Sequence, residues 1–485
     1  MKNKWSLVIH DVGNDYVNIW VGTLFQNERK YESSIVRLLL NGQTEQEHTI
    51  SKEDWEKPFS KLTQRFYKIV RFNNLKPGVQ YDVNFLRNDH PVGEHVLEAK
   101  NLSTGTFRTL PDQLKADSKP FVVALGSCYY NESDGGQVAD AYSALLNTGD
   151  ESAKPDVKFL TGDQVYLDIG LDSLSPIESE IRNRIADDYA NSWQSLREML
   201  RNGGTWMLAD DHEYWNNYPN TSGTNPYLWM ITAFDDIKKI WKDSAEEGIK
   251  QVQQISAIRT FSIGRDVSFC FADVRCQRTD KVFLATNDFK RLTDWATNLT
   301  SPGVLSIAQP LMVKPGGSAD KNLANYKQQY AELIIALAST GYDILVLSGD
   351  VHFGRIGSVP LGTKGATLHE VISSPMSNLT GIDGKIAANV AKKLKHFPAI
   401  DIDGMPKPSP KVTYPPEWRI STKQVKSWFL PTNHTKTKEH FFTLAFTKNT
   451  NGGIKVKVQA WKLRERDRKG LPRKQFRQAN ELILK

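Results

Sequence analysis

Five apolar segments of this sequence each run into polar residues that can bind metal ions or transfer protons. Aspartate, histidine, cysteine and tyrosine side chains are all metal ligands. A single aspartate at the end of a strand is usually a turn or helix-capping residue, so only the recurrence of these residue types predicts a functional site. The polar ends lie, in chain order, at residues 126–128, 162–166, 209–213, 272–275 and 349–352.

Carboxylates at the ends of neighbouring strands would repel one another and raise each other's pKa, unless cations lie between them. Asp163 could bridge two cations, because a carboxylate has two oxygens, and Asp350 and His352 could reach neighbouring ions. The thiolate of Cys128 and the phenolate of Tyr166 favour Fe³⁺ at one position. A position with oxygen ligands alone favours Ca²⁺, Mg²⁺ or Mn²⁺, and Zn²⁺ is a further alternative.

Each of these residues also has a simpler explanation when it is taken alone. Cys128 could be a small core residue, Tyr166 could serve in packing, and His352 could be a polar residue with ordinary partners. Arg275 and Arg278 could clamp a phosphate, but structural salt bridges explain them equally well. The joint pattern, and not any single residue, favours the functional interpretation.

The apolar segments that carry the polar ends predict buried strands. They are continuous apolar runs, which is typical of strands covered on both faces. Helical periodicity lies between them, at residues 177–189 and 323–337. Strands alternating with helices predict a layered α/β domain that binds ligands at the carboxyl ends of its strands. The expected strands cover residues 121–126, 157–162, 206–209, 267–272 and 344–349.

Residues 1–112 predict a separate, small all-β sandwich, because apolar and polar residues alternate there without a long helical period. Pro77 and Gly78, followed by Tyr81, resemble the tyrosine-corner turn of fibronectin type III domains. A polar linker precedes the catalytic domain, which we expect at residues 118–485. Near its end, residues 441–461 predict a hairpin of outer strands.

Composition and charge set broader limits. The chain has 485 residues and three cysteines, which fits a globular protein of two or three domains without a disulfide framework. A net charge of +7 suits an anionic substrate. The basic stretch from residue 462 to 474 is better explained as a solvated loop than as a contact for nucleic acid, so no specific nucleic acid partner is predicted.

We find no apolar stretch long enough to span a membrane and no signal peptide. The default expectation is therefore a cytoplasmic protein, with export of a processed form as the alternative.

Taken together, these segments resemble the PhoD-like (alkaline phosphatase D) family of metallophosphoesterases. The resemblance covers about residues 1–460, including the amino-terminal sandwich, and implies a four-layer αββα metallophosphatase core with a centre of iron plus calcium. The motifs that carry it are Gly126-Ser127-Cys128, residues 162–168 (GDQVYLD), residues 210–217 (DDHEYWNN) and residues 348–353 (SGDVHF).

The resemblance also implies roles for individual residues. His212 would protonate the leaving oxygen, and Asp210 or Glu213 could orient it. Asn216 or Asn217 would lie near the metals or the phosphate. By motif, the iron-type ion would be held by Cys128, Asp163, Tyr166 and His352, and the second ion by Asp163, Asp211 and Asp350.

Two features of the sequence bear on specificity. Tyr214 and Trp215 place bulky aromatic side chains inside the third motif, where we expect them to narrow the pocket and to favour a diester slightly. Residues 361–440 carry no motif that can be aligned, and they are the candidate substrate lid.

The predicted function is a metal-dependent phosphoester hydrolase, a phosphodiesterase and/or alkaline phosphomonoesterase, whose two-metal centre activates water against a small phosphoester substrate. The alternative is a catalytically silent, metal-containing binding protein with an adhesion-like sandwich domain. The enzyme is favoured because every polar position that the chemistry needs is filled.

Overall fold

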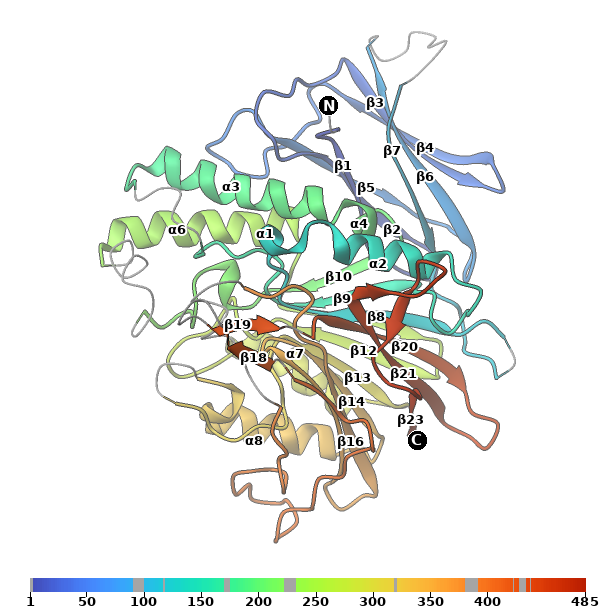
Figure 1. Cartoon of the computed structure of the whole chain (residues 1–485), viewed down its shortest axis with the longest axis vertical. Coiled ribbons are helices and arrows are strands. Elements are labelled where there is room, and N and C mark those ends of the chain that lie inside the picture. The colour runs from blue at the N-terminus through green and yellow to red at the C-terminus, as the bar shows by residue number, and fades with distance from the viewer. Residues whose placement is uncertain are drawn as a thin grey trace.

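The computed structural model begins with two antiparallel sheets packed face to face (Figure 1). One sheet contains β1 (Ser6–Val12), β2 (Val17–Thr23) and β5 (Phe66–Phe72). The other contains β3 (Ser33–Leu40), β4 (Gln43–Ser51), β6 (Gln80–Asn88) and β7 (Lys100–Arg108). The structure describes residues 3–89, 100–116, 118–169, 175–221, 233–317, 321–379, 391–421, 423–426, 433–436 and 438–485.

The predicted all-β sandwich is therefore confirmed, and its turn chemistry is as expected. Alternate residues of its strands, such as Val83 and Phe85, point into one buried apolar core. Tyr81 is fully buried, and its hydroxyl accepts a hydrogen bond of 3.0 Å from the backbone N–H of Lys76. This bond is the tyrosine corner that Pro77 and Gly78 suggested.

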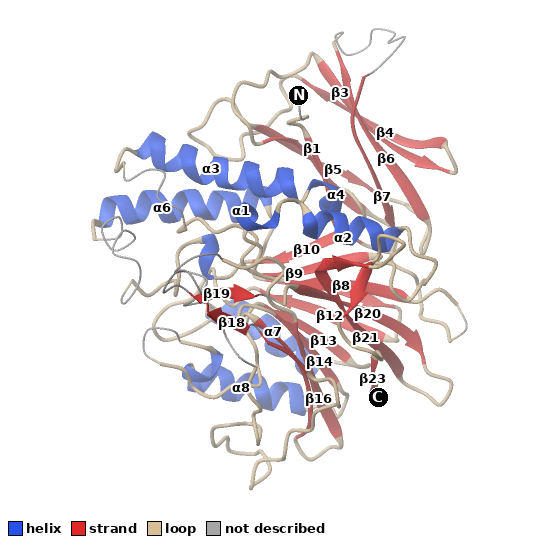
Figure 2. Ribbon diagram, in the orientation of Figure 1, coloured by secondary structure: helices blue, strands red, loops and turns tan. Residues whose placement is uncertain are grey.

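Two seven-stranded sheets form the remainder of the core (Figure 2). The first runs in the order β10-β9-β8-β20-β21-β22, with β23 paired to β21, and the second in the order β11-β12-β13-β14-β16-β15-β17. The strands of the first sheet are β8 (Phe121–Gly126), β9 (Val157–Thr161), β10 (Gly204–Leu208), β20 (His440–Lys448), β21 (Ile454–Arg466), β22 (Pro472–Lys474) and β23 (Asn480–Leu484). Those of the second are β11 (Ile258–Ile263), β12 (Val267–Ala272), β13 (Gly303–Ile307), β14 (Ile344–Ser348), β15 (Phe353–Leu361), β16 (Ala366–Ile372) and β17 (Arg419–Ser421).

Helices cover the outer faces of both sheets, which gives the predicted αββα order (Figure 1). The helices α2 (Gln137–Leu146), α3 (Glu178–Ser195), α4 (Arg197–Leu200) and α6 (Asp235–Glu247) lie on the first sheet. The helices α7 (Thr286–Thr297) and α8 (Lys327–Ala338) lie on the second. Because side chains alternate along a strand, Phe269 and Phe271 of β12 face the other sheet, whereas Cys270 faces the helices.

The prediction that the carboxy-terminal hairpin supplies outer strands was wrong for both strands, because β21 lies between β20 on one side and β22 and β23 on the other. β20 pairs directly with β8, with Phe442 opposite Leu125, so it lies inside the first sheet rather than at its edge. The pattern of residues 441–446 predicts a strand equally well in the interior of a sheet and at its edge. Only pairing with a strand more than 300 residues earlier decides its position.

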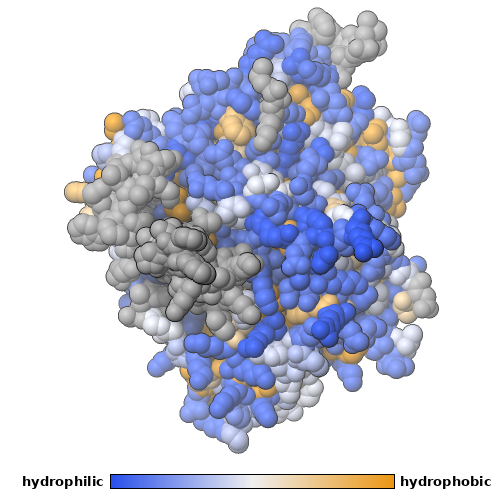
Figure 3. Space-filling view, in the orientation of Figure 1, coloured by the Kyte–Doolittle hydropathy of each residue, from blue (hydrophilic) through white to orange (hydrophobic). Residues whose placement is uncertain are grey.

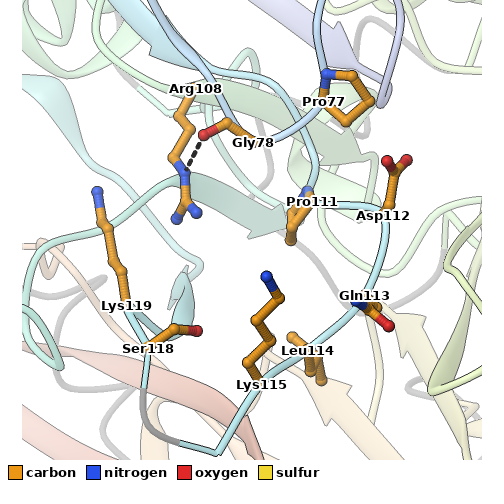
Figure 4. A pocket seen from close by; sticks show the side chains of 10 residues that line it. All are labelled: Pro77, Gly78, Arg108, Pro111, Asp112, Gln113, Leu114, Lys115, Ser118 and Lys119. Atoms are coloured by element: carbon orange, nitrogen blue, oxygen red, sulfur yellow. Dashed lines mark hydrogen bonds between the residues drawn. The ribbon is translucent and has the colours of Figure 1, made fainter.

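A single buried carboxylate joins the sandwich, the linker and the first catalytic strands. Asp156 forms ion pairs of 3.4 Å with Arg108 of β7 and with Lys119, and it accepts a 2.9 Å hydrogen bond from the backbone N–H of Val122. Arg108 and Lys119 also line a cavity of about 320 Å³ at this junction (Figure 4). None of the residues that line this cavity is a predicted site residue.

The outer surface is mainly hydrophilic on the face shown in Figure 3, with small separate groups of hydrophobic side chains. Within the described residues, no helix combines the length and the apolar character that crossing a membrane would require.

Acid should destabilise the protein through His10 of β1. Burial, followed by the nearby charges of Arg259 and Lys158, lowers the pKa of His10 to about 3. The unfolded chain binds a proton near pH 6.5, whereas the folded one does not, so stability falls as the pH drops below 6.5. We expect wild type to lose about 2 kcal/mol more than His10→Gln between pH 7 and pH 5. Urea unfolding at both values measures this difference, and equal losses in the two proteins would contradict it.

Candidate metal centre

The loops that follow β8, β9, β10 and β14 bring most of the predicted ligands to one edge of the two sheets. Carboxylate oxygens of Asp163, Asp210, Asp211 and Asp350 all lie within 4.8 Å of one another. Asp163 and Asp211 form a second such group with His212. The Cys128 thiol lies 3.3 Å from Asp163 Oδ2. Residues separated by more than 200 positions therefore meet in one cluster, as the strand ends predicted.

Four of the predicted ligands have a left-handed backbone. The φ angles are 56° at Cys128, 58° at Asp163, 65° at Asp350 and 54° at His352. A non-glycine residue in this region costs on the order of 1 kcal/mol or more, and such residues gather at functional sites. Aspartate tolerates this conformation better than cysteine does, so Cys128 is the most informative of the four.

Gly349 shows how closely the two sheets approach at this edge. A Cβ atom at Gly349, just after β14, would clash with the Ser127 hydroxyl and lie 2.7 Å from Thr161 Oγ1. Both of these residues belong to the first sheet or its loops. The absence of a side chain at Gly349 therefore allows the loops of the two sheets to share one site.

We expect Gly349→Ala to lower the free energy of unfolding by about 1–3 kcal/mol, because the backbone must move to admit the methyl group. Urea unfolding curves measure the change. Gly149→Ala is the matched control, because a Cβ atom there meets nothing within 4 Å. Equal stabilities of the two variants would show that the sheets tolerate separation at this edge.

The site is electrostatically unfavourable as protein alone. Burial, followed by Asp211, Asp210 and Glu213, raises the pKa of Asp163 well above its usual value, although His212 opposes the shift. Burial and the Asp163 charge raise the pKa of the Cys128 thiol, and burial and Cys128 do the same for the Tyr166 phenol. Cations would favour the charged form of each of these groups.

Several oxygens in the site are buried without a hydrogen-bond partner of good geometry in the described part of the chain. They are the hydroxyl of Tyr166, Oδ2 of Asp210 and Oδ1 of Asp211. Buried polar atoms are rarely left in this state unless an ion or water satisfies them. The residue types, their convergence and these oxygens all fit a bound metal.

His212 is held by a carboxylate that sequence reasoning did not assign to it. His212 Nδ1 and Asp168 Oδ1 lie 2.6 Å apart, and both side chains are buried. Burial alone would lower the pKa of His212, but Asp168, Asp211 and Asp163 together raise it well above its usual value. Asp168 is the last residue of the second motif, and its place in that motif was the one indication in the sequence of a role at the site.

Asp210 and Glu213, the two residues expected to orient His212, have other partners. Glu213 accepts hydrogen bonds from the backbone N–H groups of Asp163 (3.0 Å), Gln164 (2.7 Å) and Asp210 (2.9 Å). It thus ties the loop after β9 to the loop after β10. Burial raises the pKa of Glu213 to about 7 and that of Asp210 to about 6.

Arg275 and Arg278 both make structural contacts. Arg275 is buried, forms an ion pair with Asp210 and donates a 2.7 Å hydrogen bond to the Tyr218 carbonyl. Arg278 donates to Gln309 at 2.9 Å, and Gln309 donates to Asp350 Oδ2 at 3.1 Å. Of the two explanations that the sequence left open, these contacts match the salt bridge and positioning roles.

The aromatic residues of the third motif pack in the apolar core, contrary to the expectation that they narrow a substrate pocket. Tyr214 and Trp215 are buried in the apolar core beneath the helices of the first sheet. The Tyr214 ring stacks on Tyr218, with centroids 3.9 Å apart. These side chains therefore do not favour a diester over a monoester.

Asn216 and Asn217 lie beside the cluster and are partly exposed. The Asn216 backbone N–H donates to Asp168 Oδ2 at 2.9 Å, and that of Asn217 donates to Asp211 Oδ2 at 2.5 Å. These bonds tie the loop that carries Asn216 and Asn217 to two carboxylates of the site. The candidate lid at residues 361–440 includes β16 and β17, but residues 380–390, 422, 427–432 and 437 lie outside the described part.

The chain has a layered αββα fold with an acidic cluster at the carboxyl ends of its strands. A solved structure of PhoD covers 97% of this chain and 91% of its own, with a TM-score of 0.61 and 16% identity. A purple acid phosphatase from yellow lupin (Lupinus luteus) seeds covers 99% of this chain and 74% of its own, with a TM-score of 0.54 and 10% identity.

No protein family model matches the chain, and no curated protein matches its sequence. The PhoD-like metallophosphatase fold that the sequence motifs predicted is nonetheless confirmed by the structural similarity.

Proposed function

We propose that this protein is a metal-dependent phosphoester hydrolase with two metal ions. The observation that carries the proposal is the convergence of the Asp163, Asp211 and Asp350 carboxylates within 4.8 Å at the strand ends of a metallophosphatase fold. Three carboxylates so close together, two of them buried and that of Asp350 partly buried, need cations to be charged at once.

The donor set separates into two positions. Cys128, Tyr166 and His352 offer sulfur, phenolate oxygen and imidazole nitrogen, which favour Fe³⁺. Asp211 and Asp350 offer carboxylate oxygens alone, which favour Ca²⁺, Mg²⁺ or Mn²⁺. Asp163 would serve both positions, because its Oδ2 faces Cys128 while its carboxylate also belongs to the aspartate cluster. Bound cations supply charge neutralisation at the phosphoryl oxygens and acidify water at the site.

His212 is the proposed general acid. The Asp168 carboxylate accepts a hydrogen bond from His212 Nδ1–H, which leaves Nε2–H to give its proton to the departing alkoxide. Asp168 belongs to neither metal position, so it continues to favour protonated His212 when cations neutralise Asp163 and Asp211. The partly exposed amides of Asn216 and Asn217 are the proposed hydrogen-bond donors to phosphoryl oxygens.

Asp210, Glu213 and Arg275 serve this proposal as positioning residues. Glu213 holds the loops that carry Asp163 and Asp211 through backbone N–H groups, and Arg275 holds Asp210. None of the three needs to contact the phosphate.

Hydrolysis of bis-(p-nitrophenyl) phosphate and of p-nitrophenyl phosphate at mildly alkaline pH tests the function. We expect turnover of at least one substrate, loss of turnover after chelation, and recovery when metal is restored. Turnover of the first compound by the untreated protein assigns diesterase activity, and turnover of the second assigns monoesterase activity. Binding of two metals without any turnover would favour the catalytically silent binding protein instead.

A further inference from the structure

Residues 374–378 form a loop that contacts two of the predicted metal ligands, Cys128 and His352. The Ser374 hydroxyl donates to Cys128 Sγ at 3.1 Å and accepts from the His352 backbone N–H at 3.0 Å. The backbone N–H of Ser377 donates to the Cys128 carbonyl at 3.0 Å. This loop therefore lies against the iron-type half of the proposed centre.

Asn378, at the end of this loop, faces the imidazole of His352. Asn378 Oδ1 lies 3.2 Å from His352 Nδ1, and both side chains are buried. A carboxamide oxygen can only accept a hydrogen bond, so this contact favours the tautomer with the proton on Nδ1. In that tautomer Nε2 carries a lone pair and can bind a cation.

Asn378 is in turn held by the carboxy-terminal hairpin. Its backbone N–H donates to Glu439 Oε1 at 2.8 Å, and the Glu439 carboxylate pairs with Arg464 of β21. Arg464 also pairs with the buried Asp134 at 3.0 Å and donates to the Ser377 hydroxyl at 3.2 Å. These contacts connect β21, the loop before β20 and the 374–378 loop in one network of ion pairs and hydrogen bonds.

We propose that Asn378 is a positioning residue that sets the tautomer and ring orientation of His352 for metal binding, and that Glu439 and Arg464 hold Asn378 in place. The inference rests on the proposed function in taking this site to be a metal centre, but it requires no particular substrate. A hydrogen-bonded partner on the second nitrogen of a metal-binding histidine typically changes metal affinity by about 10–100-fold.

Two substitutions of Asn378 separate the loss of its acceptor oxygen from the loss of its volume. Its Nδ2 is buried and has no hydrogen-bond partner in the described part of the chain, so the amide donor contributes little. Asn378→Asp keeps an acceptor oxygen of nearly the same shape, whereas Asn378→Leu keeps the volume and removes the acceptor. Asn202→Leu is the control for loss of an asparagine, because the Asn202 amide donates to the Glu198 carbonyl and contacts no predicted ligand.

The test is titration of the metal-depleted, full-length protein with Co²⁺, followed by its visible absorption. We expect wild type to bind two Co²⁺ ions per chain. Asn378→Leu should lose about 10–100-fold in affinity at one of the two positions, and Asn378→Asp should stay within about threefold of wild type. Asn202→Leu should bind as wild type does. Glu439→Gln should weaken the same position by a smaller factor, because it removes the ion pair with Arg464.

Wild-type affinity in Asn378→Leu would overturn the proposal, as would equal losses in Asn378→Leu and Asn378→Asp. If Asn378→Leu does not fold, Asn378→Ala takes its place, and wild-type affinity in that variant is equally decisive. Co²⁺ binding without hydrolysis of either phosphoester, together with weaker binding by Asn378→Leu, would support the role of Asn378 while removing the proposed function. Hydrolysis by wild type, together with unchanged Co²⁺ binding by Asn378→Leu, would support the proposed function and overturn the role of Asn378.

Discussion

Asp163→Asn should abolish metal binding at both positions and lower phosphoester hydrolysis by roughly 10³-fold or more, because the Asp163 carboxylate contacts Cys128 and also belongs to the aspartate cluster. Asparagine has one carbonyl oxygen and no charge, so it cannot bridge two cations. Elemental analysis of the purified variant measures the metal content, and turnover of bis-(p-nitrophenyl) phosphate measures the activity.

The fold should survive this change. Asparagine tolerates the left-handed backbone at position 163, where φ is 58°, and its carbonyl oxygen can still accept the 3.3 Å hydrogen bond from the His212 backbone N–H. The metal-free variant should be at least as stable as metal-free wild type, because burial disfavours the charge that the variant lacks. Asp266→Asn, in the turn between β11 and β12, is the matched control and should keep both metals. Full activity in a folded Asp163→Asn protein would end the site assignment.

His212→Asn should show a loss of activity that depends on the leaving group. An alkoxide needs a proton as it departs, so hydrolysis of an alkyl phosphoester should fall by about 10²–10⁴-fold. The p-nitrophenolate ion leaves readily without a proton, so its ester should lose less than about tenfold. Rates for the two substrates with wild type and variant measure this contrast.

Asp168→Asn extends the same test to the residue that holds His212. Its amide cannot stabilise protonated His212 as the carboxylate does, so the loss should have the same dependence on the leaving group and a smaller size. Equal losses for both substrates in His212→Asn would instead indicate that His212 binds phosphate or metal. Metal content should be unchanged in Asp168→Asn, which separates this effect from that of Asp163→Asn.

Much of the fold could be predicted because its signals are local. The apolar runs at residues 121–126 and 267–272 are β8 and β12 with the same bounds. Strand β13 was not predicted, because residues 303–307 form a short strand and no polar metal ligand follows it. The division of the chain at residues 112–118 stays a prediction.

The residues that could form the site were predictable from local patterns, because each predicted ligand follows a strand whose apolar residues lie within a few positions of it. Asp163, Asp211 and Asp350 converge for that reason. The tertiary structure alone decided their partners: Asp168 for His212, Asn378 for His352 and the backbone N–H groups for Glu213. Those contacts join loops that are distant along the chain, so they depend on how the two sheets pack, and no local pattern of residues encodes them.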